Sequence, residues 1–524
     1  MCNLKYTRKF IVADRHKLSL FLNFLIILLV IASIDSSPAY AQQPNQWAPQ
    51  TRIPTYDDLV NEQPPRLIVD QNHTVYAFNS QTLEDQRVIM YREWTREAGW
   101  TDPNDIFMAP LKGNIEVLDV FLDHDNMVHI VLAMGEDVYY SKTLLSKAYN
   151  ASAWSTPELI GSELTQPVNG SIGGNDRGEL VITYGGQSDG NGVYWVYSEA
   201  DGNAWTEPSP LFFTYYDNLT SMGSQIYVGQ SNQSHVVWNT VNQQGQGGKI
   251  YYSNFNFESQ KWKEPITLAE KAKGGKLALG TLTPSVIEYN GNIIVSYYDG
   301  INNGNWWRLS HDRGETWTEP SQVSSQHVGT NGSLSFAIDS QNSLHAFFGQ
   351  RINDLNHGMW HTIWTGYGWS TITPVVSGPQ VRDEIGGNGF DPKSARAVIS
   401  QGNVVLVTWV TDGFAGENGV WFSYTTLDTP ELPTIEPNKV MPPVTIDISD
   451  SSVVTPSALI TTTDSSTLPA SRSIQSADDN HQLYPSVDEP SNNQLRPLMV
   501  GVANVVLIIA VFFIYQVYSR TSRL

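Results

Sequence analysis

The residues that could do chemistry in this chain stand in polar loops rather than in a compact motif. The richest loops, at 185–192, 299–304, 351–357, 381–389 and 412–417, combine glycines, amides, carboxylates and isolated basic groups. Such groups form hydrogen bonds with sugar hydroxyls or with a peptide. Ordinary solvated loops are the competing interpretation, because loops are polar by default. The candidate ligand-binding side chains are Asp189, Asp299, Arg351, Asp354, His357, Arg382, Asp383, Glu384, Asp412 and Glu417.

Other chemistries have weaker signals. The only cysteine is Cys2, so no disulfide, thiol nucleophile or cysteine-bound metal is expected beyond the N-terminus. Asp123-His-Asp-Asn126 resembles a fragment of a calcium loop, but it lacks the glycine and the final glutamate of an EF-hand. The sequence has no glycine loop suited to phosphate and no Ser–His–Asp signature. We therefore expect no metal and no cofactor, and calcium at the aspartate-rich loops stays an open alternative.

The net charge of the chain argues against one class of binding partner. The sequence has 31 basic and 52 acidic side chains and a formal net charge of −21. Such an excess of negative charge keeps a protein soluble and repels phosphate backbones. We therefore do not expect a nucleic-acid partner.

Seven tryptophans divide residues 42–427 into repeats. Successive members are 53, 54, 51, 57, 55 and 52 residues apart, and most begin a Trp-x-x-Pro phrase such as Trp205-Thr-Glu-Pro. Self-similarity at a fixed period of this length is typical of repeat architectures. The seven are Trp47, Trp100, Trp154, Trp205, Trp262, Trp317 and Trp369.

Each repeat has the pattern of four short strands. A hairpin with a polar Asp or Asn turn precedes the tryptophan, as in 67–78, 120–131 and 336–347. His129 and His345 fall at equivalent positions in two of these hairpins, where we expect them to be packed. An aromatic third strand follows, and the Trp-x-x-Pro phrase begins a fourth strand whose proline suits an outer edge. With no helical periodicity, the pattern predicts an all-β fold, a seven-bladed β-propeller of four-stranded blades.

The ends of the repeat predict how the ring closes. The last unit, 395–427, has three strands and no tryptophan phrase, whereas the first phrase, at 47–53, precedes any inner strand. We therefore expect an N-terminal outer strand to complete the last blade. This closure removes the exposed edges that a linear array would leave.

The N-terminal residues 1–41 have the pattern of a signal peptide. A basic leader is followed by an apolar run and by the small-x-small site Ala39-Tyr40-Ala41. An uncleaved membrane anchor is the alternative. The lack of disulfides in an exported chain of this size favours a prokaryotic envelope.

The C-terminal part predicts a tether. Residues 428–497 are rich in Ser, Thr, Pro and Asp, which indicates a disordered stalk. The apolar run 498–518 is long enough for one transmembrane helix, and Arg520 and Arg523 assign the tail 519–524 to the cytoplasm. We expect a single-pass type I membrane protein with its propeller (42–427) outside the cell.

One turn has a family-specific motif. Ser310-His-Asp-Arg-Gly-Glu-Thr-Trp317 matches Ser-x-Asp-x-Gly-x-Thr-Trp, and 197–205 is a degraded copy. Over about 380 residues the chain therefore resembles the Asp-box (BNR repeat) propeller superfamily, which includes the sialidases. The resemblance implies a structural turn in which the aspartate accepts N–H bonds, the glycine has a positive φ and the tryptophan packs into the blade. The motif positions are Ser310, Asp312, Gly314, Thr316 and Trp317.

The resemblance also implies one enzymatic alternative. Sialidases bind a substrate carboxylate with three arginines and use a tyrosine nucleophile paired with glutamate and an aspartate as acid/base. Thr51-Arg-Ile-Pro54 is similar to their first arginine motif, but the repeat assigns Arg52 to an outer strand, away from the axis. Sialidases with this box have six blades, whereas seven tryptophans are present here. The catalytic residues under this alternative would be Arg66, Arg351, Arg382, Tyr298 and Asp299.

The sequence therefore favours a binding module over an enzyme. In a propeller, the loops between strands two and three and those between successive blades converge on one face. We predict a cell-surface propeller that presents this face to a glycan or a protein. A membrane-tethered, sialidase-like exo-glycoside hydrolase is the alternative.

Overall fold

A computed structural model describes the propeller part of the chain. The described residues are 47–54, 64–83, 86–109, 113–166, 168–214, 219–229, 232–242, 247–270, 281–299, 304–325, 329–353, 356–378, 392–410 and 419–434. All of them belong to one compact unit, Met1–Val444. The predicted signal peptide, the span and all but the first residues of the stalk lie outside them. Within the described ranges, no helix is both long and apolar enough to cross a membrane.

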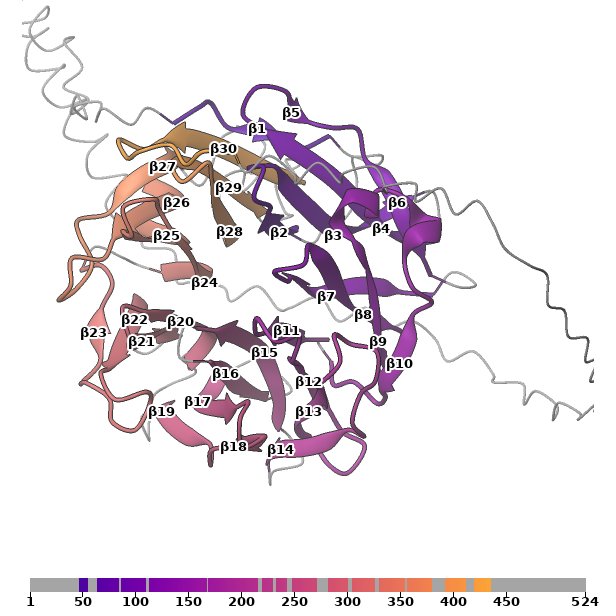
Figure 1. Ribbon diagram of the computed structural model, residues 1–524. Helices are drawn as coiled ribbons and strands as arrows, with labels where there is room; N and C mark the ends of the chain where they lie inside the picture. Colours follow the sequence, from indigo (N-terminus) through magenta and orange to yellow (C-terminus); the bar gives the residue numbers. More distant parts are fainter. Residues whose placement is uncertain are drawn as a thin grey trace, which may run out of the picture. The chain divides into compact units, whose positions relative to one another are not determined.

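Seven antiparallel sheets are arranged as the blades of a ring (Figure 1). The innermost strands are β2 (Arg66–Val69), β7 (Ile115–Leu122), β11 (Gly170–Gly174), β15 (Leu219–Val228), β20 (Thr281–Tyr289), β24 (Gly329–Ile338) and β28 (Lys393–Ser400). The second strands are β3 (Val75–Leu83), β8 (Met127–Met134), β12 (Leu180–Gly186), β16 (Gln233–Asn242), β21 (Asn292–Asp299), β25 (Leu344–Asn353) and β29 (Val404–Val410).

The outer half of each blade has the same order. The third strands are β4 (Gln86–Thr95), β9 (Asp137–Leu144), β13 (Gly192–Ser198), β17 (Gly247–Asn256), β22 (Gly304–Ser310), β26 (Asn356–Ile363) and β30 (Val420–Thr426). The outer strands are β6 (Asn104–Met108), β10 (Glu158–Gly161), β14 (Ser209–Phe213), β19 (Ile266–Glu270), β23 (Ser321–Gln322), β27 (Thr373–Gly378) and β1 (Thr51–Arg52). Two short strands, β5 (Gly99–Trp100) and β18 (Lys261–Trp262), precede the outer strand on β4 and β17, and 3-10 turns η2 (Leu145–Lys147) and η3 (Ala151–Ala153) follow β9. The predicted seven four-stranded blades are confirmed.

The N-terminal strand closes the ring as predicted. Strand β1 pairs antiparallel with β30, with Thr51 opposite Phe422 and Arg52 opposite Trp421. Arg52 therefore stands on the outer strand of the seventh blade rather than beside the axis.

Each repeat tryptophan precedes its outer strand, and six of the seven contact a ring of the neighbouring blade. Trp369 instead contacts Phe336 and Trp364 of its own blade. In all seven blades the outer strand starts four residues after the tryptophan, so the phrase leads into the strand rather than forming its first residues. Trp154 of the second blade contacts Phe107 of the first with ring centroids 5.2 Å apart. Trp205 of the third blade contacts Tyr140 of the second at 4.8 Å. At six of the seven tryptophans, the sequence period is thus also the period of the blade-to-blade packing.

The predicted aspartate turns are present in the inner hairpins. The Oδ1 atoms of Asp70, Asp123 and Asp339 each accept backbone N–H groups from the residues two and four places ahead, at 2.7 to 3.0 Å. His129 and His345 lie on the second strands and are 0% and 2% exposed, so the prediction that they are packed is confirmed.

Candidate functional site

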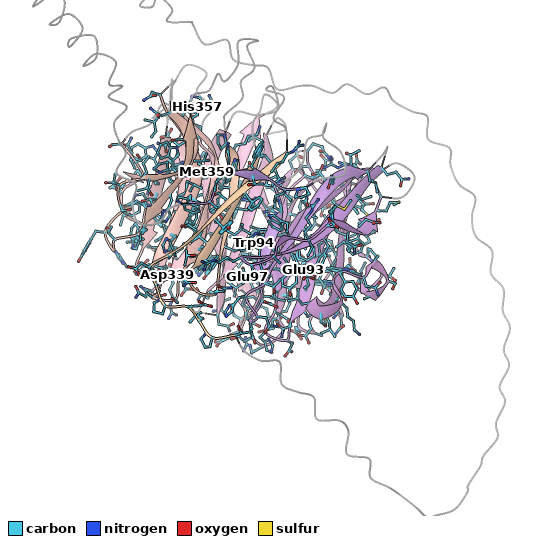
Figure 2. All side chains as sticks on the ribbon, turned by 90° about the horizontal axis from the view of Figure 1, so that it is seen from above. Glu93, Trp94, Glu97, Asp339, His357 and Met359 are labelled. Carbon is cyan, nitrogen blue, oxygen red and sulfur yellow. The ribbon has the colours of Figure 1, made fainter. Side chains whose placement is uncertain are left out.

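The propeller has two faces, which are seen edge-on in Figure 2. His357, at the start of β26, lies at the face where second strands turn into third strands and one blade leads to the next. We call this the loop face. Asp339, in the turn between β24 and β25, lies toward the opposite face, which we call the turn face. By their places between strands or at strand ends, the described candidates Asp189, Asp299, Arg351 and His357 belong to the loop face.

Four of the ten candidates are among the described residues. Asp189 is exposed in the β12–β13 loop, whose backbone is fixed because the Asp189 N–H donates to the Tyr194 hydroxyl at 2.9 Å. Asp299 and Arg351 are partly exposed at the ends of β21 and β25, whereas His357 is buried. The others, Asp354, Arg382, Asp383, Glu384, Asp412 and Glu417, lie outside the described residues.

Tyr298, the nucleophile of the enzymatic alternative, is only 6% exposed. Burial raises the pKa of its hydroxyl, the charge of Arg351 acts against this shift, and the charge of Asp299 adds to it. Tyr298, Asp299 and Arg351 are therefore close enough to interact across the seam between the fifth and sixth blades. A phenol is protonated near neutral pH at its ordinary pKa, and the raised pKa favours that state further.

A ring of polar residues lies at one equivalent position on the seven innermost strands. Their partners on the second strands are Phe78, Val131, Thr183, Val237, Ser296, Phe347 and Thr408, in blade order. The seven residues, which we call the axial layer, are Arg66, Asp119, Ser171, Gln225, Ser285, Ser335 and Arg396.

Serines of the axial layer join neighbouring blades. The Ser171 hydroxyl donates to Asp119 Oδ2 at 2.5 Å and accepts the N–H of Ile226 at 3.0 Å, so it contacts the blades on both sides. The hydroxyl of Ser285 donates to a carbonyl oxygen of β24 at 2.7 Å, and that of Ser335 accepts an N–H group of β28 at 2.9 Å. A small hydroxyl suits this position because it satisfies backbone groups that the blade twist leaves unpaired near the axis.

The charged members of the axial layer stand together on the seventh, first and second blades. The Nε atom of Arg66 lies 4.0 Å from Asp119 Oδ1, and their side chains are 25% and 20% exposed. Burial, and next the charge of Arg66, lowers the pKa of the Arg396 guanidinium to about 9, while Asp119 acts in the opposite direction. Arg396 donates from Nη1 to the Ala395 carbonyl at 3.2 Å, and its buried Nε has no hydrogen-bond partner among the described residues.

This axial cluster, defined as Arg66, Asp119 and Arg396, has two guanidinium groups and one carboxylate. Its excess positive charge and its incompletely satisfied N–H donors suit an oxyanion such as a carboxylate or a sulfate. The axial cluster is therefore locally positive, although the whole chain has a formal net charge of −21.

Sequence reasoning found one member of the axial cluster and missed two. Arg66 was a candidate, whereas Asp119 and Arg396 were not. The available signal was a charged residue inside an otherwise apolar innermost strand, as in 117–120 and 395–398. Arg351, the proposed partner of Arg66, stands on the sixth blade, with the seventh blade between them in the ring.

The turn at 310–317 has the geometry that its motif predicts. Ser310 Oγ accepts the N–H of Gly314 at 2.7 Å, and Gly314 has a φ of 86°. The carboxylate of Asp312 accepts the N–H of Thr316 at 2.8 Å and its hydroxyl at 2.5 Å. These bonds hold the pKa of Asp312 at about 2. Trp317 contacts Tyr252 of the preceding blade with centroids 4.9 Å apart, so this turn supports a seam rather than a reaction.

The described part of the chain contains no group of three His, Cys, Asp or Glu side chains placed to bind a metal ion. Asp123, from the calcium-like fragment, instead accepts hydrogen bonds within its own turn and from His129.

Comparisons by sequence give no relatives: no family model matches the chain, and no curated protein matches it. In structure it is similar to an ulvan lyase from a new family of polysaccharide lyases, with 13% identity over 71% of this chain and 97% of that one and a TM-score of 0.48. It is also similar to the BP39L lectin from Burkholderia pseudomallei, with 12% identity, 70% and 95% coverage and a TM-score of 0.48. A third similar structure is the intramolecular trans-sialidase from Ruminococcus gnavus, with 12% identity, 72% and 96% coverage and a TM-score of 0.42.

Proposed function

We propose that this protein is a surface recognition propeller whose loop face binds an anionic glycan without cleaving it. The proposal is based on the axial cluster: among the described residues, Asp119 is the carboxylate found beside Arg66 and Arg396, one negative charge for two positive ones. A sugar carboxylate or sulfate would complete the charge balance and accept the remaining guanidinium N–H bonds. Hydroxyls of the same sugar would face polar loop side chains such as Asp189.

The sequence at the two ends of the chain supports an extracellular location for the loop face. We propose that residues 1–41 are removed on export, that 428–497 form a stalk and that 498–518 cross the membrane once. We also propose membership of the Asp-box superfamily, which the geometry of the turn at 310–317 supports.

Binding is favoured over hydrolysis by the state of Tyr298. The Tyr298 side chain is only 6% exposed, so little of the candidate nucleophile is open to a substrate, and burial also raises its pKa. The alternative function, an exo-glycoside hydrolase, would be revealed in the experiment below by the release of sugar.

The test is a glycan array that holds carboxylated, sulfated and neutral sugars, incubated with the full-length protein in detergent micelles. Retention on acidic sugars and free sugar in the wash are both measured. We expect retention without release, and a loss of retention in Arg66→Ala and Arg396→Ala. Arg96→Ala is the matched control, because it removes one positive charge from an exposed turn far from the axial cluster.

Two outcomes would overturn the proposal. Release of an acidic sugar by the wild type, abolished in Arg66→Ala, would make the protein a hydrolase. Equal retention of acidic and neutral sugars, or equal loss in Arg96→Ala, would show that the axial cluster does not select the ligand. Sulfated and carboxylated spots on the same array distinguish the two sources of the anion.

A further inference from the structure

On the second strands of three blades, a buried histidine lies in a row between a carboxylate and a third-strand side chain. In the second blade, His129 lies 3.1 Å from Asp123 through Nε2 and 2.7 Å from the Tyr140 hydroxyl through Nδ1. In the fourth blade, His235 lies 2.8 Å from the Tyr252 hydroxyl through Nδ1 and 3.3 Å from Glu288 through Nε2. Here the carboxylate comes from β20 of the fifth blade rather than from the turn of the same blade.

The row in the sixth blade ends in a second imidazole instead of a phenol. The Nε2 atom of His345 lies 3.3 Å from Asp339 Oδ2, and its Nδ1 lies 2.8 Å from the Nε2 atom of His361. The two imidazole rings stack with centroids 5.1 Å apart. His345 is 2% exposed and His361 is 8% exposed, so both are shielded from water.

Proton positions in this row follow from its acceptors. Because the Asp339 carboxylate accepts a hydrogen bond, Nε2 of His345 carries hydrogen and its Nδ1 accepts the N–H of His361. One added proton can bind at the other nitrogen of His361, because a single hydrogen then still lies between His345 Nδ1 and His361 Nε2. A second added proton sets two N–H groups against each other across a separation of 2.8 Å. A row that ends in a phenol has only one imidazole to protonate.

The surroundings of the pair resist its protonation. Burial lowers the pKa of His361 to about 3, and the charge of His345 acts in the same direction. Burial also lowers the pKa of His345, which Asp339 partly offsets. Among the described residues, the titratable groups that face the pair are Asp339 from the β24–β25 turn and the two histidines themselves. The pair adjoins an apolar cluster whose members on β27, β28 and β29 are Val375, Val376, Ala395, Ala397, Ile399, Val405, Val407 and Trp409.

The N-terminal segment covers His361. The Trp47 ring lies edge-on to His361 with centroids 6.2 Å apart, and both rings contact Phe347. Trp47 is held there by the next residue, because the Ala48 N–H donates to the Tyr424 carbonyl at 2.8 Å. The segment then forms β1 and ends at the first blade, where Arg92 donates to the Pro54 carbonyl. His361 thus lies under the sixth-blade end of the segment that closes the ring.

We propose that the Asp339–His345–His361 row is an acid-sensitive latch: protonation of both imidazoles releases Trp47 and frees the end of the closing segment from the sixth blade. The physical reason is that a doubly protonated pair must separate and reach water, and Trp47 is the cover that can move. Residues 47 and 48 come free, and the Ala48–Tyr424 bond opens with them. Strand β1 stays paired with the seventh blade and Pro54 stays bonded to the first, so the ring loosens at one end without unfolding.

The test is amide hydrogen exchange in the full-length protein, expressed as protection factors so that the pH dependence of intrinsic exchange is removed. The Ala48 amide reports the latch, and the Ile53 amide, which donates to Val420, is the internal reference. Between about pH 6.5 and pH 3 we expect protection of Ala48 to fall by up to about tenfold per pH unit for each proton taken up. Protection of Ile53 should fall much less.

The matched variant is His361→Tyr, which gives the sixth blade the residue that the second and fourth blades have. It should make the protection of Ala48 independent of pH in this range. His311→Tyr, at an exposed turn, is the control and should respond like the wild type. Constant protection of Ala48 in the wild type would overturn the proposal even if His361→Tyr does not fold. An equal fall in His361→Tyr, or an equal fall of Ala48 and Ile53, would overturn it too.

Discussion

Arg66 and Asp119 face each other across the seam between the first two blades, with the Nε atom 4.0 Å from Oδ1. The same carboxylate accepts the Ser171 hydroxyl and the Ile172 N–H from the third blade. Asp119 therefore links three blades and limits the positive charge of the axial cluster.

Asp119→Asn should separate these two roles. The amide keeps the size of the carboxylate but loses its charge, so we expect the free energy of unfolding to fall by about 1–3 kcal/mol. Retention of anionic sugars should rise, because two guanidinium groups then lack a counter-charge. Chemical denaturation and calorimetric titration with a sulfated sugar measure the two effects. Asp125→Asn, at an exposed turn, should change neither quantity, and weaker sugar binding by Asp119→Asn would contradict the assignment of the cluster.

Gly314→Ala should destabilise the turn at 310–317 more than Gly291→Ala destabilises its own turn. Both glycines have positive φ values, 86° and 74°, so both substitutions incur left-handed strain of about 1–2 kcal/mol. A Cβ at Gly314 would also lie 2.4 Å from the Tyr252 ring, whereas none of the described atoms lies within 4 Å at Gly291. The added clash should cost about 1–3 kcal/mol in urea denaturation. An equal loss in the free energy of unfolding for the two variants would exclude a clash between the new Cβ and Tyr252.

Trp154→Ala should show how much the tryptophan repeat contributes to the seams. Trp154 is 7% exposed and packs on Phe78 and Phe107 of the preceding blade. We expect a loss of about 3–5 kcal/mol, because removal of a buried tryptophan leaves a cavity between blades. Tyr367→Ala, at a ring that is 95% exposed, should change stability by less than about 0.5 kcal/mol. Differential scanning calorimetry compares the two variants, and similar melting temperatures would contradict a seam role.

The pH dependence of unfolding should have two windows. The pKa of His361 is lowered from 6.5 to about 3, so its contribution is complete above pH 6.5 and is lost as the pH falls toward 3, at up to about 1.4 kcal/mol per pH unit. The pKa of Asp312 is lowered from 3.8 to about 2, so its contribution is lost only as the pH falls below 3.8. Urea denaturation at a series of pH values measures both windows. His361→Tyr should flatten the first window only, and Asp312→Asn the second only.

Much of the fold could be predicted from the repeat. The tryptophan spacing predicted the number of blades, and the missing phrase in the last unit predicted that β1 would complete it. The polar turns predicted the aspartate-bonded hairpins, such as that of Asp123. These features are local or periodic. Because a propeller repeats one local unit, the sequence of each repeat is enough to predict the strands and turns of its blade.

The candidate site was predicted less well. Polar character selected loop residues such as Asp189, which the structure describes as exposed. The same reasoning selected His357, which is buried, and paired Arg66 with arginines of the sixth blade and of the segment that leads to the seventh. Composition identifies side chains that can bind a ligand, but the strand register decides which of them reach the axis.

The sequence by itself therefore determined the architecture: seven blades, their strand order and the closing strand. Only the tertiary structure decided that Arg66, Asp119 and Arg396 meet, and that Trp47 covers His361. The physical reason is that both sets join residues of different blades, separated by about 50 to more than 300 positions. Such contacts depend on how blades twist and pack around a closed ring, and no local pattern of hydrophobicity or turn residues encodes that geometry.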